Sequence, residues 1–348
     1  MQRSGARHPD AGQCSPAAST SRQSASDDPQ HLYHTLNEYL LMEPKFQPKL
    51  CLPDESENGE VTTGARDGAA HVLRCLKVWY DLPVDVLINA INLFDRFLTK
   101  MKVRPCHVPC ITVSCMNIAL DQYAADNNIK RTVSLDELVA ISQSACTAGD
   151  AARMSRVVAD KLALAPGSRA ATACHWLKLL RPLLLLQLAH LPGDHELSVQ
   201  ESDLAQLLEV VSCDAVCATA RPSELALVLL FYRLGESYKY NSALPEAAYF
   251  VCEFARQLQA HCHMSDASLA SVRSRVRWVV SRYERSEARR DQRQRLVWRL
   301  SERTLKVLRP TDRLTSLLPT IEEQHLDGSP RRLELCELRT KTSEWKKM

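Results

Sequence analysis

Glycine is scarce in this sequence. Only 10 of the 348 residues are glycine, whereas globular proteins average about 7 %. Glycine-rich phosphate-binding loops and folds built on tight β-turns both depend on the backbone freedom of glycine. The shortage therefore argues against both. With 45 % hydrophobic residues, a chain of this length can bury a substantial core and divide into about two domains.

The sequence also lacks a long uninterrupted hydrophobic run. Its most apolar window, 176–191, is interrupted by Lys178 and by Arg181-Pro182, so it falls short of the roughly 20 apolar residues that a membrane span needs. Residues 1–30 are rich in Ser, Ala, Gln and Pro, and they contain no apolar segment of the kind found in signal peptides. We therefore expect no membrane insertion.

Closely paired cysteines are missing as well. The 13 cysteines are spread from Cys14 to Cys336 without a CxxC spacing. This distribution is typical of reduced thiols in the nucleus and the cytoplasm rather than of a disulfide framework. We expect the chain to work in those two compartments.

Some cysteines lie near histidines, and metal binding has to be weighed for them. The two groups are Cys106, His107, Cys110 and Cys115, and the triplet His261-Cys262-His263. A structural zinc site needs four converging ligands, usually from paired short spacings, and neither group provides them. We expect these thiols, together with Cys213 and Cys217, to be small core residues. The sequence predicts no metal, no cofactor and no catalytic residues.

Charge is balanced overall but unevenly distributed. The formal net charge is +3, yet residues Arg273–Arg313 contain 14 basic and 5 acidic residues. Val276, Val279 and Val280 recur there at helical spacing, so we interpret the stretch as the charged outer face of a packed helix. Two alternatives remain open: a surface for protein docking or nuclear import, and a nucleic-acid-binding surface, because Trp278 lies among the arginines.

Helical spacing of hydrophobic residues dominates from Ala69 onward. The segment 108–120 is apolar nearly all round, which predicts a helix enclosed by others. Ser134 and Glu137 form a capping-box pattern that opens the next helix. The first set of predicted helices covers 72–79, 83–98, 108–120, 135–144 and 150–164.

A second set of helical segments follows Pro166-Gly167. It comprises 170–191, 202–218, 222–237, 245–261, and 265 onward into the basic stretch. Each set is about 100 residues long and has an apolar third helix, so two tandem all-α bundles are the simplest account. Before them, 31–42 has the spacing of a short helix, and we expect Pro44 to end it.

The motif Asp95-Arg96-Phe97-Leu98 ends an apolar helical stretch that begins at Ile88. This stretch closely resembles the second helix of a cyclin box, and the resemblance covers about 66–164 and, more weakly, continues to Tyr283. Within the cyclins the chain is most similar to cyclin G. The segments that carry this similarity are 97–103, 221–227 and 317–321.

The resemblance implies a fold of two tandem five-helix cyclin-box bundles. We expect four regions along the chain. They are a mostly disordered N-terminal region (1–60), an N-terminal cyclin box (66–165), a C-terminal cyclin-box-like bundle (169–283) and a basic C-terminal extension (284–348).

The resemblance also implies a non-catalytic regulatory subunit for a Ser/Thr protein kinase of the cyclin-dependent class, in cell-cycle and growth control. Arg66 and Asp95 match the family's structural ion pair. Cyclins usually contact the kinase backbone through a Lys and a Glu, and the matching residues here are Asp121 and Ser155. Losing one partner of such a buried pair typically costs about 2–5 kcal/mol, so we expect atypical kinase engagement.

Substrate recruitment through the usual docking patch is not expected either. That patch consists of a Met, a Leu and a Trp on the first helix, and the matching residues are Ala65, Ala69 and Val72. Similarity to cyclin G implies an alternative function, an adaptor that recruits B′ regulatory subunits of the type-2A protein phosphatase. The segment Leu318, Pro319, Thr320 and Ile321 is a candidate adaptor peptide. A nucleic-acid-bound factor is the third hypothesis, because general transcription factors also use paired cyclin-like folds.

Overall fold

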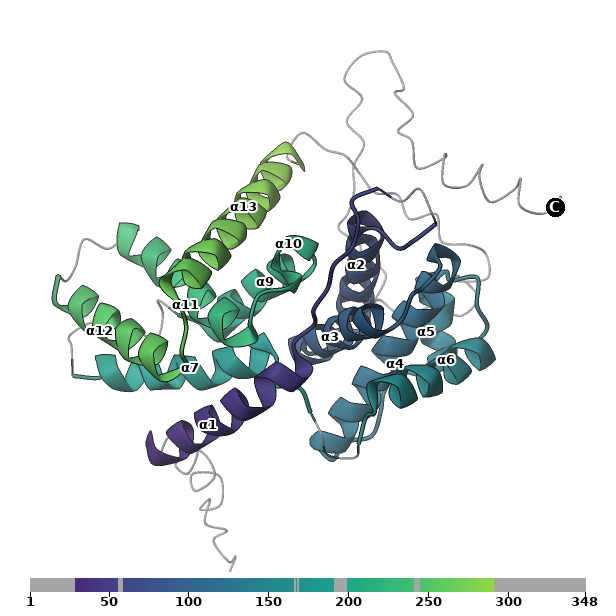
Figure 1. The fold of residues 1–348 in the computed structure, drawn as a ribbon, viewed down its shortest axis with the longest axis horizontal. Helices are drawn as coiled ribbons and strands as arrows, with labels where there is room; N and C mark the ends of the chain where they lie inside the picture. Colours follow the sequence, from purple (N-terminus) through teal and green to yellow (C-terminus); the bar gives the residue numbers. More distant parts are fainter. Residues whose placement is uncertain are drawn as a thin grey trace, which may run out of the picture. The chain divides into compact units, whose positions relative to one another are not determined.

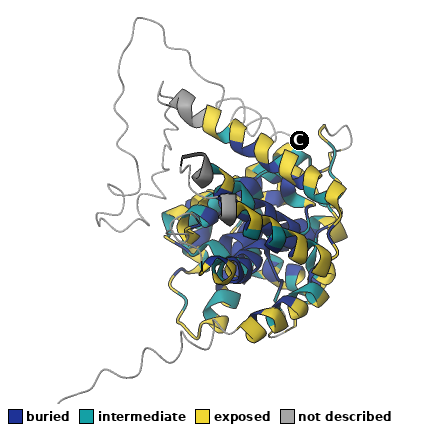
Figure 2. Cartoon of the chain, turned by 90° about the vertical axis from the view of Figure 1, so that its left-hand side faces the viewer, coloured by how far each residue is buried: buried dark blue, intermediate teal, exposed yellow. Residues whose placement is uncertain are grey.

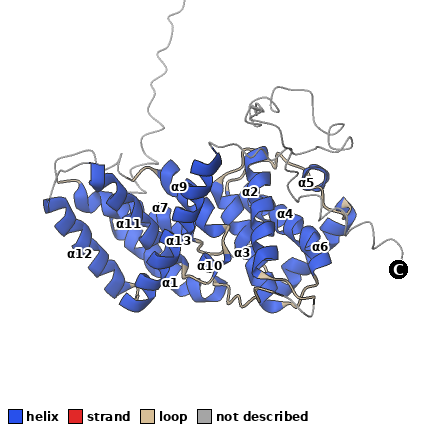
Figure 3. Cartoon of the chain, turned by 90° about the horizontal axis from the view of Figure 1, so that it is seen from above, coloured by secondary structure: helices blue, strands red, loops and turns tan. Residues whose placement is uncertain are grey.

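A computed structural model describes residues 29–55, 59–165, 167, 169–190, 199–240 and 245–290. For 237–240, 245–247 and 286–290 only the backbone is described. Within these ranges the regular elements are helices and none is a strand (Figure 3). The predicted all-α fold class is confirmed. None of the described helices combines the length and the apolar character needed to cross a membrane.

The first bundle follows the predicted order of helices. It consists of α2 (Thr63–Trp79), α3 (Val84–Lys100), a short 3-10 turn η1 (Pro105–His107), α4 (Val108–Asp126), α5 (Leu135–Ser142) and α6 (Ala148–Leu162) (Figure 1). Helix α2 begins at Thr63, well before the predicted 72–79, because the side chain of Thr62 accepts a hydrogen bond from the backbone N–H of Ala65 and caps the helix.

Helix α4 is the hub of this bundle. Every residue from Ile111 to Leu120 is buried, and α2, α3, α5 and α6 all pack against the helix. Small side chains such as Ser114 and Ala119 allow this close approach. The capping box of Ser134 and Glu137 is confirmed at the start of α5. A second box, Thr147 with Asp150, opens α6 and was not predicted.

The second bundle consists of α7 (Ala173–Leu188), α9 (Glu201–Ser212), α10 (Ala215–Ala218), α11 (Pro222–Tyr240), α12 (Pro245–His261) and α13 (Asp266–Arg290). The buried residues (dark blue) face the interior of the molecule, and the exposed residues cover the outer sides of the helices (Figure 2). The single helix predicted over 202–218 is wrong. The chain breaks at Asp214, whose carboxylate accepts from the N–H of Val216 and starts α10 as a separate helix.

Helix α1 (Pro29–Phe46) precedes the first bundle in sequence but packs on the second. Leu32 and Leu36 belong to the core formed by α7 and α11, and the ring of Tyr39 meets that of Trp176 edge to face at 5.6 Å. The helix runs beside α7 (Figure 1). The prediction that Pro44 ends the helix is wrong, since Pro44 lies inside its last turns. Of the region 1–60 that was predicted to be mostly disordered, residues 1–28 fall outside the described residues, whereas 29–46 form α1.

A buried carboxylate at the end of α1 joins it to the start of α11. Glu43 accepts hydrogen bonds from Arg221 Nη2 at 2.8 Å and from the backbone N–H of Ser223 at 2.7 Å. Because the first N–H groups of a helix have no partner within the helix, an anion placed there is stabilised. Sequence reasoning marked 221–227 as a family feature without finding this contact, since Glu43 is 180 residues away from Ser223.

Polar contacts also link the two bundles. On α2, Lys77 Nζ lies 2.6 Å from a carboxylate oxygen of Glu209 on α9. The carboxylate of Asp67 accepts a hydrogen bond from the N–H of Ala215 at 2.8 Å. Lys178 on α7 donates to Asp85 on α3 at 2.6 Å. Glu209 is buried, so its pairing with Lys77 offsets the desolvation of the carboxylate.

The free energy of unfolding is expected to fall in mild acid because of His175, whose ring lies against that of Tyr39 on α1. Its Nδ1 is hydrogen-bonded to Thr172 Oγ1 at 2.8 Å, and burial lowers the pKa of His175 below the usual 6.5 despite the opposing charge of Asp85. Below pH 6.5 the unfolded chain binds a proton that the folded chain resists, so the free energy of unfolding decreases as the pH falls.

Urea unfolding at a series of pH values tests this prediction. His175→Asn should flatten the decrease below pH 6.5. Burial also lowers the pKa of His71, so part of the slope should remain. The exposed His31 provides the control, and His31→Asn should leave the slope as it is. A slope unchanged by His175→Asn would assign the acid sensitivity to other groups.

Candidate partner-binding site

Asp121 lies on the exposed side of α4, near its C-terminal end. Its side chain is 59 % exposed, and a carboxylate oxygen accepts a hydrogen bond from Arg131 Nη1 at 2.7 Å. Arg131 also donates from Nε to the carbonyl of Val133. The carboxylate is therefore paired within the chain, where it helps to hold the loop between α4 and α5.

Ser155 does not lie on the surface. Only 8 % of the residue is exposed, and its hydroxyl donates to the carbonyl of Ala151 at 2.9 Å on the same helix, α6. The hydroxyl also accepts from Asn117 Nδ2 at 3.3 Å, across the α4–α6 contact. Ser155 thus contributes to the packing between α4 and α6, and its hydroxyl already donates one hydrogen bond and accepts another within the chain.

Asn117 is a residue that sequence reasoning missed. It lies one turn before Asp121 on α4 and is largely buried, and its Oδ1 atom makes no hydrogen bond to any described residue. A buried acceptor without a partner is unusual and costly. Because this oxygen has almost no contact with solvent, a donor at the α4–α6 face reaches it only if the surrounding side chains move. No local pattern in the sequence distinguishes Asn117 from a satisfied core amide.

The structure brings Arg66 and Asp95 together. Arg66 Nε donates to Asp95 Oδ1 at 2.8 Å and Nη2 to Oδ2 at 2.7 Å, in a buried two-pronged pair between α2 and α3. Burial alone would lower the pKa of Arg66, but the charge and hydrogen bonds of Asp95 outweigh it and raise this pKa above its ordinary value. The pair orients α2 against the helix that carries the Asp95-Arg96-Phe97-Leu98 motif.

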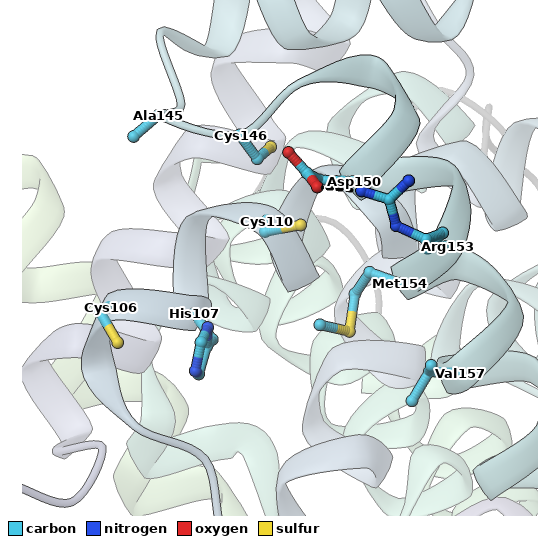
Figure 4. Close-up of a pocket in the computed structure, with 9 residues that line it drawn as sticks. All are labelled: Cys106, His107, Cys110, Ala145, Cys146, Asp150, Arg153, Met154 and Val157. Atoms are coloured by element: carbon cyan, nitrogen blue, oxygen red, sulfur yellow. Dashed lines mark hydrogen bonds and ion pairs between the residues drawn. The ribbon is translucent and has the colours of Figure 1, made fainter.

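A pocket of about 410 Å³ opens between the start of α4 and the start of α6 (Figure 4). Cys106, His107 and Cys110 contribute to it, whereas Cys115 is fully buried in the core. Burial and the neighbouring Cys146 raise the pKa of Cys110 to about 11, so it is a thiol near neutral pH. The complete lining is Cys106, His107, Cys110, Ala145, Cys146, Asp150, Arg153, Met154 and Val157.

Of the other histidines and cysteines singled out in the sequence, the cysteines are buried and the histidines take part in hydrogen bonds. In the triplet, Cys262 is buried, while His261 Nε2 is hydrogen-bonded to Asn37 on α1 at 2.8 Å and the carbonyl of His263 accepts from Arg221. Cys213 and Cys217 are buried, and burial raises the pKa of each to about 12. Within the described ranges no three His, Cys, Asp or Glu residues are placed to hold a metal ion.

The first helix of the bundle presents only small side chains at the docking-patch positions. Ala69 is buried, and Ala65 and Val72 are half-buried against the first core. The other candidate segment, Leu318, Pro319, Thr320 and Ile321, lies outside the described residues. The α4–α6 face is therefore the candidate site for which the structure provides geometry.

Comparison with known proteins places this geometry in a family. The mouse protein Cyclin-G2 is 30 % identical over 304 residues, an alignment that covers 86 % of this chain and 83 % of that protein. The chain belongs to the cyclin family. A model of the cyclin N-terminal domain matches residues 34–165, so it extends from within α1 to just beyond α6.

Two further cyclins define how far the similarity reaches. Cyclin G of Drosophila melanogaster is 40 % identical over 300 residues, which are 84 % of this chain but only 51 % of that protein, so the chain spans about half of it. The X-ray structure of a viral cyclin from herpesvirus saimiri aligns with a TM-score of 0.53, at 16 % identity, over 72 % of this chain and 99 % of that one. The predicted similarity to cyclin G and the cyclin fold are both confirmed.

Proposed function

We propose that this cyclin is a non-catalytic regulatory subunit that binds a Ser/Thr kinase of the cyclin-dependent class, in cell-cycle and growth control in the nucleus and the cytoplasm. Membership in the cyclin family is the observation that carries the proposal. The buried Arg66–Asp95 pair supports it, because it holds the helices of the first bundle in a defined register. The α4–α6 face is the proposed contact.

The contact proposed here differs from the usual one. A carboxylate at Asp121 and a buried hydroxyl at Ser155 cannot supply the charges of a Lys and a Glu. A regulatory subunit raises the active state of a kinase only as far as it binds that state better. We therefore expect kinase binding that activates weakly.

Recruitment of phosphatase 2A B′ regulatory subunits is the second candidate function. It is favoured by the internal pairing of Asp121 with Arg131 and by the burial of Ser155, since an adaptor needs neither side chain for a kinase. The segment Leu318, Pro319, Thr320 and Ile321 is proposed as its contact.

A paired binding and activity measurement separates the two functions. Purified wild-type chain and the double variant Asp121→Lys/Ser155→Glu would be probed with cyclin-dependent kinases and with phosphatase 2A B′ subunits. For a kinase subunit with an atypical contact, we expect the double variant to activate the kinase roughly tenfold more strongly, about 1.4 kcal/mol of added preference for the active state. Glu38→Lys, a charge reversal at an exposed residue of α1, is the matched control.

Each outcome has a defined meaning. Equal activation by the wild type and the double variant would refute the idea that these two residues weaken engagement. Phosphatase-subunit binding that disappears on deletion of residues 291–348, without any kinase binding, would favour the adaptor. Tight DNA binding with a steep salt dependence would contradict both functions. Because Ser155 is buried, the melting temperature of the variant must be compared with that of the wild type before its activity is interpreted.

A further inference from the structure

An exposed surface that combines apolar and basic residues runs along α10 and α13. Trp278 is 47 % exposed and Val216 is 40 % exposed. Exposed apolar side chains that gather on one surface point to an interaction site, whereas single scattered ones do not. Arginines flank both Trp278 and Val216. We refer to the set Val216, Arg275, Trp278, Arg282 and Arg285 as the Trp278 surface.

The rotation of α13 explains why Trp278 faces outward. Val272, Val276, Val279 and Val280 are all buried in the second core. At 100° per residue these valines define one side of the helix, and Trp278, Arg282 and Arg285 fall on the opposite side. The exposure of Trp278 therefore follows from core packing and is not caused by fraying of the helix.

Contacts with α10 hold two of the arginines in place. Arg275 donates to the carbonyl of Val216 at 3.4 Å and to Thr219 Oγ1 at 3.2 Å. Both acceptors are uncharged, so the positive charge of Arg275 is not cancelled. The guanidinium of Arg282 stacks over the ring of Trp278, 5.2 Å from its centroid, and lies 3.5 Å from a carboxylate oxygen of Asp214.

Positive charge exceeds negative charge along α13. The side chains described on α13 include five arginines and only two acids, Asp266 and Glu284. Arg277, beside Trp278, forms no ion pair with any described residue. An exposed tryptophan fixed by a stacked arginine is the kind of residue that dominates binding energy in protein interfaces.

We propose that the Trp278 surface docks an acidic segment of a partner protein, with carboxylates on the arginines and one apolar side chain on Trp278 and Val216. The aliphatic side chain of Val216 favours a polypeptide over nucleic acid, because bases stack on aromatic rings and not on a valine. Asp214 already pairs with Arg282 and Glu284 lies beside the surface, so the carboxylates of the segment would be held chiefly by Arg275 and Arg285. The partner docked here is additional to the one proposed for the α4–α6 face.

Fluorescence anisotropy with a defined probe tests the proposal. The probe is a fluorescein-labelled peptide of glutamates around a central Leu-Phe pair, and the same peptide with glutamine in place of glutamate serves as the neutral comparison. We expect the full-length chain to bind the acidic peptide and not the neutral one. Arg282→Ser/Arg285→Ser and Trp278→Ala should each weaken binding by roughly tenfold or more.

The control variant removes the same charge elsewhere. Arg153→Ser/Arg256→Ser replaces two arginines whose side chains are each 70 % exposed on other helices, and we expect it to change affinity less than about twofold. An equal loss in this control would show a bulk charge effect. Full binding by both surface variants would assign the peptide to another part of the chain, and a DNA duplex that binds more tightly than the peptide would make the surface a nucleic-acid site. Each of these three results overturns the proposal.

Discussion

Asp95→Ala is expected to unfold the first bundle under conditions in which the wild-type chain is folded. Removing the carboxylate leaves the guanidinium of Arg66 buried between α2 and α3, with only a 3.3 Å contact from Nη1 to Asp67. Breaking a buried ion pair from one side costs about 3–5 kcal/mol. Single domains have a free energy of unfolding of only about 5–15 kcal/mol, so this loss is a large fraction of the total stability.

Urea unfolding followed by circular dichroism measures this loss of unfolding free energy. Two further variants show where the loss comes from. Arg66→Met/Asp95→Leu removes both charges and should recover most of the stability, since apolar replacements of a buried pair are often neutral. Asp160→Ala removes an exposed carboxylate on α6 and should change stability by about 0.5 kcal/mol or less. A loss below about 1 kcal/mol for Asp95→Ala would mean that Arg66 finds another partner or reaches water.

Glu43→Ala is expected to release α1 from the second bundle. The substitution leaves the N–H of Ser223 without an acceptor and takes away the carboxylate to which Arg221 donates from Nε and Nη2. Arg221 keeps its contacts with the carbonyls of Cys262 and His263 and its 3.7 Å ion pair with Glu224, so its charge stays partly compensated. We expect the free energy of unfolding to fall by about 2–4 kcal/mol. This is more than a neutral hydrogen bond contributes, because the pairing is charged and buried.

Limited proteolysis and thermal unfolding together identify the effect of Glu43→Ala. Cleavage near α1 should become faster, and the melting temperature should fall. Glu43→Gln keeps one acceptor oxygen and should lose less than Glu43→Ala. Glu38→Ala, at an exposed carboxylate of the same helix, should behave like the wild type. If Glu43→Ala has the same melting temperature as the wild type and is cleaved at the same rate, Glu43 does not anchor α1.

Sequence patterns correctly predicted the features that depend on interactions between residues close in sequence. The capping box at Ser134, the Pro83 start of α3 and the enclosed helix α4 depend on residues close in sequence, and the structure has all three. The break at Asp214 was missed, although an aspartate can cap a helix, because the apolar spacing continues across it. Local spacing alone cannot distinguish one long helix from two short ones.

The candidate site was predictable only in part. Family motifs pointed to Asp121 and Ser155, but burial decides what each side chain can do, and Ser155 turned out to be enclosed between α4 and α6. The free acceptor of Asn117 depends on which donors surround it in three dimensions. A similar limit applies to Trp278, whose exposure depends on how the valines of α13 turn the helix into the core.

By itself the amino-acid sequence determined the helical class, the two-bundle organisation and the relation to cyclins, because apolar spacing and short motifs are read along the chain. Tertiary structure alone decided that α1 crosses to the second bundle, that Glu43 stabilises the start of α11, and that Ser155 is internal. These outcomes depend on contacts between residues up to 180 positions apart. Their energies come from desolvation and charge pairing, which exist only once the helices have packed.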